Sequence, residues 1–268
     1  MSIEQIRKAC AKDQPQLHRL WETVFGDPPE LVQAFFDRFP PEVSGWVLCY
    51  GETIYSAAYV IPGNWYIHQS DIHPAAYVYA VATEPSFRGR GYAGALMKAI
   101  AEFAQKRNLL LYTRPAEQSL FPWYNTKMNA GNIGYLHHCL FLVENGSEKL
   151  PFRRLTPAKY GVARERFLAN QPHLILSENF LRLQEIYSDG FYAVGEGCCC
   201  VIKKEGRIQI PELLISNMQK EEAIQTLLEH FQANEAVIRF VGNSSNIPGV
   251  AFSGNPLPEQ TNWGLFLE

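Results

Sequence analysis

A glycine-rich loop between an apolar segment and a helical segment constrains this fold more than any other sequence feature. Residues 75–82 are apolar throughout, which is typical of a strand buried on both faces. Residues 94–106 repeat apolar side chains at the helical period, and residues 109–113 resemble the next strand. This strand, helix and strand predict a parallel pair, and hence a mixed α/β fold. The connecting loop contains a G-x-G-x-x-G pattern formed by Gly89, Gly91 and Gly94.

Two well-known nucleotide-binding loops share these glycines but not their setting. In a dinucleotide fold the strand turns almost directly into the first glycine, whereas here six residues intervene, including Pro85. No acid closes the following strand at Thr113 to bind a ribose hydroxyl, and no G-K-[ST] follows as in a P-loop. The loop instead opens a helix with little side-chain bulk. Its backbone N–H groups and the helix dipole therefore predict an anion site.

Arg88 and Arg90 add positive charge to this loop. Guanidinium groups bind phosphate oxygens in a fork, so the two arginines favour a pyrophosphate as the anion. The alternative is a tight loop whose arginines are only solvated. The loop residues alone leave both interpretations open.

The stretch Arg88-Gly89-Arg90-Gly91-Tyr92-Ala93 resembles the [RQ]-x-x-G-x-[GA] signature of the GCN5-related N-acetyltransferases, the GNAT family. The preceding Val-Ala-Thr-Glu-Pro-Ser-Phe-Arg and the following Ala-Leu-Met-Lys helix are similar to that family's central motif. The expected order of elements is also similar, with helices at 17–25 and 31–39 and a hairpin of 46–50 with 54–61 before the strand. The resemblance implies an acyl-CoA N-acyltransferase fold that binds acetyl-coenzyme A (acetyl-CoA) as cosubstrate.

The resemblance also implies roles for the strand end and the loop. One N–H near Val81 or Ala82 would polarise the thioester carbonyl, which requires the strand to splay from its parallel neighbour and leave backbone groups unpaired. The pantetheine arm would contact backbone groups of Val81, Ala82 and Thr83. The phosphates would be held by Arg88, Gly89, Arg90, Gly91, Tyr92, Ala93 and Gly94.

Acetyl transfer to an amine needs a neutral nucleophile, stabilisation of an oxyanion and a proton for the departing thiolate. Tyrosine suits the last role, because its reference pKa of about 10 keeps it protonated at neutral pH. In the GNAT family a P-A…Y-x-x-x-G-F segment carries the tyrosine that acts as general acid, and the matching residue here is Tyr124. Met128 and Asn129 replace the G-F pair, and simple packing is the alternative role for Tyr124.

The general base is left unassigned. Some family members carry a glutamate on the buried strand, at a position that corresponds to Tyr77 here. Glu84 after the strand is also consistent with a solvated loop acid, and His73 with a structural histidine. A chain of water molecules ending in bulk solvent is a further alternative.

The element pattern restarts near Pro151, which predicts two domains of related architecture, residues 1–150 and residues 151–268. The counterpart of the glycine loop, residues 216–220, contains neither glycine nor arginine. We therefore interpret the second half as a degenerate GNAT-like domain that shapes the acceptor pocket or supports the first domain. An unrelated α+β domain is the alternative. In this second half the expected helices are 155–168, 178–187 and 221–231, and the expected strands are 191–194, 198–203, 207–215, 236–241 and 263–267.

Composition limits the class of protein and its partners. A hydrophobic content of 47% over 268 residues excludes a disordered or fibrous chain. The net charge of −3 gives no general basic field for nucleic acid, and the apolar runs are too short to span a bilayer. The N-terminal residues lack a secretory pattern, so we expect a cytoplasmic protein.

The cysteine pattern also fits the expectation of a cytoplasmic protein, because no C-x-x-C pair occurs. Three of them are contiguous at residues 198–200. We interpret these as small strand residues, with a metal or redox site as the alternative. We expect no metal ion to be bound by the site residues.

The residues and the resemblance together predict an N-acetyltransferase. It would move acetyl from acetyl-CoA to a primary amine by direct attack in a ternary complex, and the acceptor would be a small molecule or a peptide. No nucleic acid or membrane partner is expected. The competing class is a catalytically inactive acyl-CoA sensor, suggested by the lost G-F pair and the unassigned base.

Overall fold

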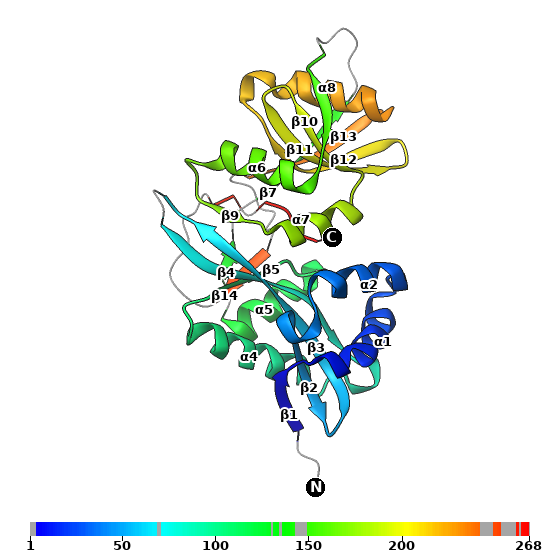
Figure 1. Ribbon diagram of the computed structural model, residues 1–268, viewed down its shortest axis with the longest axis vertical. Coiled ribbons are helices and arrows are strands. Elements are labelled where there is room, and N and C mark those ends of the chain that lie inside the picture. Colours follow the sequence, from blue (N-terminus) through cyan, green and yellow to red (C-terminus); the bar gives the residue numbers. More distant parts are fainter. Residues whose placement is uncertain are drawn as a thin grey trace. The chain divides into compact units, whose positions relative to one another are not determined.

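The computed structural model describes residues 4–68, 71–129, 131–133, 136–142, 149–241, 249–252, 261–262 and 264–267. The chain divides into two compact units (Figure 1). Unit 1 comprises Met1–Asn64, His73–Ile133 and Gly249–Leu257, and unit 2 comprises Trp65–Ile72, Gly134–Pro248 and Pro258–Glu268. Among the described residues, the helices are all too short or too polar to cross a bilayer.

The helix pair predicted at the start of the chain is confirmed. Helix α1 (Gln14–Phe25) ends at Gly26, which adopts the left-handed conformation with φ +71°. Helix α2 (Pro29–Arg38) begins with a proline, and the short helix α3 (Pro41–Ser44) follows. The apolar faces of α1 and α2 meet the sheet in an aromatic cluster, formed by Trp21, Phe35, Phe36, Tyr59 and Tyr79.

The first sheet has the strand order β1-β2-β3-β4-β5-β14-β6 (Figure 1). The predicted hairpin is formed by β2 and β3, which pair antiparallel across residues 51–52. The helix predicted at 94–106 is α4 (Tyr92–Gln105), and α5 (Phe121–Met128) follows the next strand. The strands are β1 (Glu4–Lys8), β2 (Gly45–Tyr50), β3 (Thr53–Tyr66), β4 (Ile72–Thr83), β5 (Leu110–Thr113), β6 (Gly131–Ile133) and β14 (Gly249–Phe252).

The parallel pair of β4 and β5 is confirmed, and it is short. Its last register pair joins Tyr77 to Tyr112, although β4 continues to Thr83. Ala80 lies beyond this pair with φ +47°, a left-handed conformation that side chains rarely adopt. The backbone of residues 78–83 is therefore not paired with β5, as the predicted slot requires.

The second sheet has the order β7-β13-β12-β11-β10-β8. Helix α8 covers it with Ile224, Leu227 and Leu228, which are fully buried in one core with Val201 and Ile208. The helices of unit 2 are α6 (Pro157–Leu168), α7 (Glu178–Ile186) and α8 (Lys220–Phe231). The strands are β7 (Leu136–Leu142), β8 (Phe152–Leu155), β9 (His173–Ile175), β10 (Gly190–Val194), β11 (Gly197–Lys204), β12 (Arg207–Leu214) and β13 (Glu235–Val241).

The two sheets exchange strands. Strand β14, which follows β13 along the chain, lies between β5 and β6 in the first sheet. Strand β7, from before residue 150, pairs antiparallel with β13 in the second sheet. The compact units are therefore discontinuous in sequence. The division of the chain into two domains of related architecture, residues 1–150 and residues 151–268, stays a prediction.

Some element boundaries differ from the predictions. The helix predicted from residue 155 begins at Pro157, because Thr156 caps it by accepting a hydrogen bond from the Lys159 N–H, and Leu155 ends β8. The strand predicted at 263–267 is wrong for residues 264–267, which form no strand but are buried from Leu265 onward; residue 263 lies outside the described residues. Strands β1, β6, β7, β8, β9 and β14 were not expected from the sequence.

The contiguous cysteines lie on β11 with their side chains buried. Burial raises the pKa of Cys198 and of Cys200 to about 12. Their thiols are therefore protonated at neutral pH, whereas metal ligands and nucleophiles are thiolates. This arrangement favours the interpretation of the triplet as strand packing.

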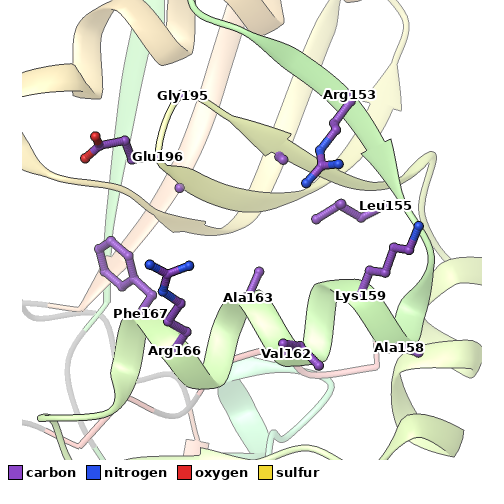
Figure 2. Close-up of a pocket in the computed structure, with 12 residues that line it drawn as sticks. Arg153, Leu155, Ala158, Lys159, Val162, Ala163, Arg166, Phe167, Gly195 and Glu196 are labelled. Carbon is purple, nitrogen blue, oxygen red and sulfur yellow. The ribbon is translucent and has the colours of Figure 1, made fainter.

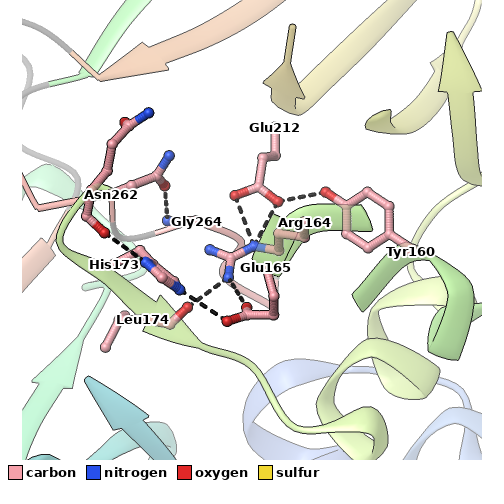
Figure 3. A network of polar contacts seen from close by, with 9 residues as sticks. Tyr160, Arg164, Glu165, His173, Leu174, Glu212, Asn262 and Gly264 are labelled. Carbon is pink, nitrogen blue, oxygen red and sulfur yellow. Dashed lines mark hydrogen bonds and ion pairs between the residues drawn. The ribbon is translucent and has the colours of Figure 1, made fainter. Parts of the chain in front are cut away.

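A buried polar network fixes α6 within unit 2 (Figure 3). The Arg164 guanidinium donates to both carboxylate oxygens of Glu212, at 3.0 and 3.2 Å, and to the carbonyl of Leu174 at 2.6 Å. Glu212 also accepts a hydrogen bond from the Tyr160 hydroxyl at 2.5 Å. Arg164 and Tyr160 are fully buried, so α6 cannot rotate without breaking charge-assisted bonds.

Candidate functional site

A cavity of about 770 Å³ in unit 1 brings most of the predicted site residues together. Its walls come from the end of α1, the end of β4, the glycine loop, the start of α4 and residues 116–124. Ala82 and Arg90 do not line it. The predicted residues that line it are Val81, Thr83, Arg88, Gly89, Gly91, Tyr92, Ala93, Gly94 and Tyr124.

The glycine loop has a conformation that depends on its glycines. After the single turn η2 (Pro85–Phe87), Gly89 and Gly91 have φ values of +78° and +83°. Gly91 is the N-cap of α4, and the helix ladder begins with the Ala95 N–H donating to its carbonyl. A Cβ atom built at Gly89 or Gly91 meets nothing within 4 Å. Open space therefore lies against the loop, beside a helix end whose first N–H groups have no acceptor within the helix.

The two loop arginines have different surroundings. The Arg88 Nε donates to the Thr83 carbonyl at 3.2 Å, so its side chain ties the loop to the end of β4. The Arg90 guanidinium lies 5.0 Å from the centre of the Phe87 ring, in a cation–π contact. Both residues are exposed, and only Arg88 lines the cavity.

Aromatic stacking supports the loop from β3. Tyr55 stacks on Phe87 with centroids 4.1 Å apart and on Tyr92 at 5.6 Å. The Tyr92 hydroxyl donates to Glu4 of β1 at 3.1 Å, which raises the pKa of this tyrosine. These contacts fix the first residue of α4, and so the direction of the helix end.

The end of β4 is held on the side of β3. The Ser56 hydroxyl on β3 donates to the carbonyl of Ala82 at 2.7 Å and lies 3.0 Å from the Thr83 hydroxyl. Ala82 is buried, whereas Val81 and Thr83 are half-buried and line the cavity. The backbone beyond the last β4–β5 pair is thus fixed without pairing to β5.

Tyr124 lies on α5 with its side chain buried at the cavity wall. Burial raises the pKa of Tyr124 to about 12, and a hydrogen bond with Thr113 opposes the shift. The Trp123 ring lies edge-on to the Tyr124 ring, at 4.8 Å. The hydroxyl is therefore held in place and is protonated at neutral pH, as a proton donor must be.

The turn after α5 forms without the G-F pair of the resembling family. Asn129 is the C-cap and adopts the left-handed conformation with φ +50°. Asparagine tolerates this conformation better than most residues, and its N–H donates to the Tyr124 carbonyl. Asn129 therefore ends the helix at Met128 as a glycine would.

None of the three residues considered as a base lines the cavity. Tyr77 is buried and stacks on Tyr79 and Tyr112, with centroids 5.6 and 5.3 Å apart. Glu84 donates its backbone N–H to the Tyr55 carbonyl, and His73 is half-buried near the start of β4. The general base is not identified by this geometry.

Sequence reasoning missed several residues that line the cavity. Phe25 ends α1 and is 40% exposed, which is unusual for a phenylalanine in an amphipathic helix. Glu117 contributes a carboxylate beside the loop wall. The sequence signal that could have indicated Val24 and Phe25 is their position as an apolar pair at the end of a predicted helix. The other missed residues are Val24, Phe87, Ala116, Leu120 and Trp123.

Comparisons with known proteins agree with this geometry. Residues 5–125 match the family model described as an acetyltransferase (GNAT) domain. Residues 5–125 form a GNAT domain. The matched segment runs from β1 to α5, and it contains the glycine loop and Tyr124. A GNAT domain with this fold supports acyl transfer as the general chemistry of the chain.

Solved structures extend the likeness of the fold beyond the GNAT domain. A GCN5-related N-acetyltransferase from Kribbella flavida aligns over 93% of this chain and 71% of its own, with a TM-score of 0.71 and 14% identity. A probable N-acyltransferase from Enterococcus faecalis covers 93% and 72%, with a TM-score of 0.74 and 16% identity. A GCN5-related N-acetyltransferase from Anabaena variabilis covers 93% and 72%, with a TM-score of 0.71 and 14% identity. No curated protein matches the chain.

Proposed function

We propose that this chain transfers acetyl from acetyl-CoA to a primary amine of a small-molecule or peptide acceptor, by direct attack in a ternary complex. The observation that carries the proposal is the shared cavity, which joins the glycine loop, the unpaired end of β4 and the Tyr124 side chain. An anion site suits the phosphates of the cosubstrate, a slot of backbone groups suits its arm and the oxyanion, and a protonated hydroxyl suits the departing thiolate.

The residues present fit the phosphate groups of coenzyme A. Gly89 and Gly91 leave open space where side chains would otherwise project, so a pyrophosphate could approach the N–H groups at the start of α4. Arg88 lies in the same wall and adds positive charge. We assign the phosphates to residues 88–94, with Arg90 at the exposed edge.

The backbone of Val81, Ala82 and Thr83 fits the pantetheine arm. This segment continues past the last β4–β5 pair, so its N–H and C=O groups on the β5 side are not part of that ladder. An N–H near Val81 or Ala82 would stabilise the oxyanion that forms as the amine attacks. The left-handed turn at Ala80 directs this part of the strand.

The acyl group enters on the thioester of acetyl-CoA. In the transfer, the lone pair of the neutral amine forms a C–N bond at the carbonyl carbon, and the C–S bond then breaks. Tyr124 donates its hydroxyl proton to the departing thiolate sulfur, and solvent restores that proton. The ammonium proton of the acceptor leaves to a base that we do not assign, and a water chain is sufficient for this role.

We further propose that residues 151–268 derive from a second, degenerate GNAT-like domain. The sequential strands β8, β10, β11, β12 and β13 occur in the same neighbour order as β1 to β5 of the first sheet. Helix α8 begins at Lys220, the last of residues 216–220, and these five residues include neither glycine nor arginine. The Gln219 side chain instead accepts a hydrogen bond from the Glu196 N–H, at 3.4 Å.

Titration with coenzyme A by calorimetry tests the anion site. Gly91→Glu places a carboxylate in the open space beside the loop and is expected to abolish binding. Gly206→Glu is the matched control, because Gly206 also has a positive φ (+70°) and open space around its Cβ position, but lies in the β11–β12 turn. Equal affinity of wild type and Gly91→Glu would contradict the proposal.

A thiol-release assay with acetyl-CoA and a panel of primary amines tests the transfer itself. An acetyltransferase releases coenzyme A only when a suitable amine is present. An acyl-CoA sensor, the competing function, binds the thioester in the calorimeter but releases no thiol with any amine. The two assays together separate the enzyme, the sensor and a chain that does not bind coenzyme A.

A further inference from the structure

A second cavity, of about 990 Å³, lies in unit 2 along one face of α6 (Figure 2). The helix forms one wall, and the sheet forms the other with residues of β8, β10 and the turn that follows β10. Arg153 and Ala193 are register partners on neighbouring strands, so both belong to the same stretch of sheet face. This groove shares no residue with the cavity of the GNAT domain.

The groove is positively charged. Figure 2 shows the guanidinium groups of Arg153 and Arg166 pointing from opposite walls into the space between them. Lys159 lies near the start of α6, on the same wall as Arg166. Across the described ranges of the chain, these three cations form no ion pair. Glu196 is the acidic residue of the lining, and its carboxylate points away from both guanidinium groups (Figure 2).

The charges flank an apolar surface. Leu155, Val162, Ala163 and Phe167 lie between the cationic ends of the groove. Val162 is 72% exposed, so the groove is shallow and one side of any ligand would stay in water. An enclosed pocket suits a small molecule, whereas an open groove with an apolar floor suits an extended chain.

The spacing of the cations sets the spacing of the charges they could bind. Lys159 and Arg166 are seven residues apart on α6, which corresponds to two turns and about 10 Å along the axis. Three residues of an extended peptide also span about 10 Å, and because successive side chains alternate, residues three apart point to opposite sides. An acid at each end and two apolar residues between them would therefore direct one carboxylate toward the α6 cations and the other toward Arg153 on the facing wall.

Buried polar contacts anchor the α6 wall of the groove. The opposite face of α6 carries Tyr160 and Arg164, which are fully buried and bonded to Glu212 (Figure 3). A wall fixed in this way loses little conformational freedom on binding.

We propose that this groove binds an extended acidic peptide segment with two carboxylates three residues apart and apolar side chains between them. One carboxylate would contact Arg166 on α6 and the other Arg153 on the facing wall, with Lys159 adding positive charge. Of the two apolar side chains, one would lie against Val162 and Ala163 and the other against Leu155. This site is independent of the acetyl-CoA cavity and of the reaction proposed for it.

Fluorescence anisotropy with a labelled peptide Gly-Glu-Leu-Leu-Glu-Gly tests this proposal on the full chain. The peptide is expected to bind the wild type, and raising the salt from about 50 mM to about 300 mM should weaken binding. Arg166→Glu and Arg153→Glu should each weaken it by about tenfold or more. Lys204→Glu is the matched control, because Lys204 is an exposed lysine of the same unit outside the groove and should leave affinity unchanged.

Three results would overturn the proposal. One is equal binding of a peptide with glutamine in place of both glutamates. Another is unchanged affinity of Arg166→Glu, with circular dichroism showing that the variant is folded. The third is full competition by a short dicarboxylate such as adipate at the peptide's own affinity, which would make the site one for a small dianion instead.

Discussion

The Thr113 hydroxyl donates a hydrogen bond to the carbonyl of Val78 across 2.7 Å, one residue beyond the last backbone pair of β4 and β5. The same side chain forms a hydrogen bond with Tyr124. A single buried hydroxyl therefore links the unpaired segment of β4 to the proposed proton donor. This link makes Thr113 a positioning residue for the proposed reaction.

Thr113→Val should destabilise the fold and slow the reaction. The Val78 carbonyl would lose a buried partner, which costs about 1–3 kcal/mol in the free energy of unfolding. Urea denaturation and kcat measurements check both effects. Thr113→Ser keeps the hydroxyl and should restore most of kcat, and equal kcat values for the valine and serine variants would contradict the positioning role.

Tyr124→Phe should lower kcat by about 10²-fold or more, because it removes the proton donor while keeping the ring in place. Affinity for coenzyme A, measured by calorimetry, should stay close to wild type. Tyr50→Phe is the control, since Tyr50 is 44% exposed and does not line the cavity. A kcat for Tyr124→Phe within twofold of wild type would assign Tyr124 to packing alone.

Ionisation of Tyr124 should not lower kcat between neutral pH and about pH 10. Burial raises its pKa to about 12, so the hydroxyl stays protonated and able to donate from neutral pH up to about 10. Initial rates of thiol release at several pH values check this. A kcat that falls with an apparent pKa below about 10, with acceptor ionisation accounted for, would argue against Tyr124 as the acid.

Arg164→Met should be severely destabilising. It leaves the Glu212 carboxylate buried without its ion-pair partner, which costs about 3–5 kcal/mol in the free energy of unfolding. The double variant Arg164→Met with Glu212→Met removes both charges and should recover much of that loss. Urea denaturation of the single and double variants measures it, and additive losses would show that the pair is not coupled.

The thiols of residues 198–200 should resist labelling in the folded chain. Burial raises the pKa values of Cys198 and Cys200 to about 12, so few thiolates exist at pH 8. Cys10 and Cys139 are half-buried and should react first with a disulfide reagent. Labelling of the triplet as fast as that of Cys10 would indicate an accessible thiolate that this structure does not contain.

The sequence predicted the parts of the fold that local pattern determines. Helix periodicity located α1, α2 and α4, and the apolar run located the core of β4. The glycine positions also predicted the loop at the start of α4, because only glycine readily takes the φ of +83° found at Gly91.

Long-range pairing could not be predicted in the same way. Nothing local indicates that β14 inserts between β5 and β6, or that β7 pairs with β13, because strand partners are chosen by tertiary packing. The short strand β8 was also missed, since two of the four residues in Phe152–Leu155 are exposed arginines. At the site, Phe25 and Glu117 come from distant segments whose convergence depends on that packing.

A crystal structure of the chain grown with coenzyme A tests the central claim most directly. The account predicts a diphosphate within hydrogen-bond distance of backbone nitrogen atoms between Gly89 and Gly94, with the thiol near the Tyr124 hydroxyl. Density for the coenzyme elsewhere on the chain, with the space beside Gly91 holding only solvent, would contradict it.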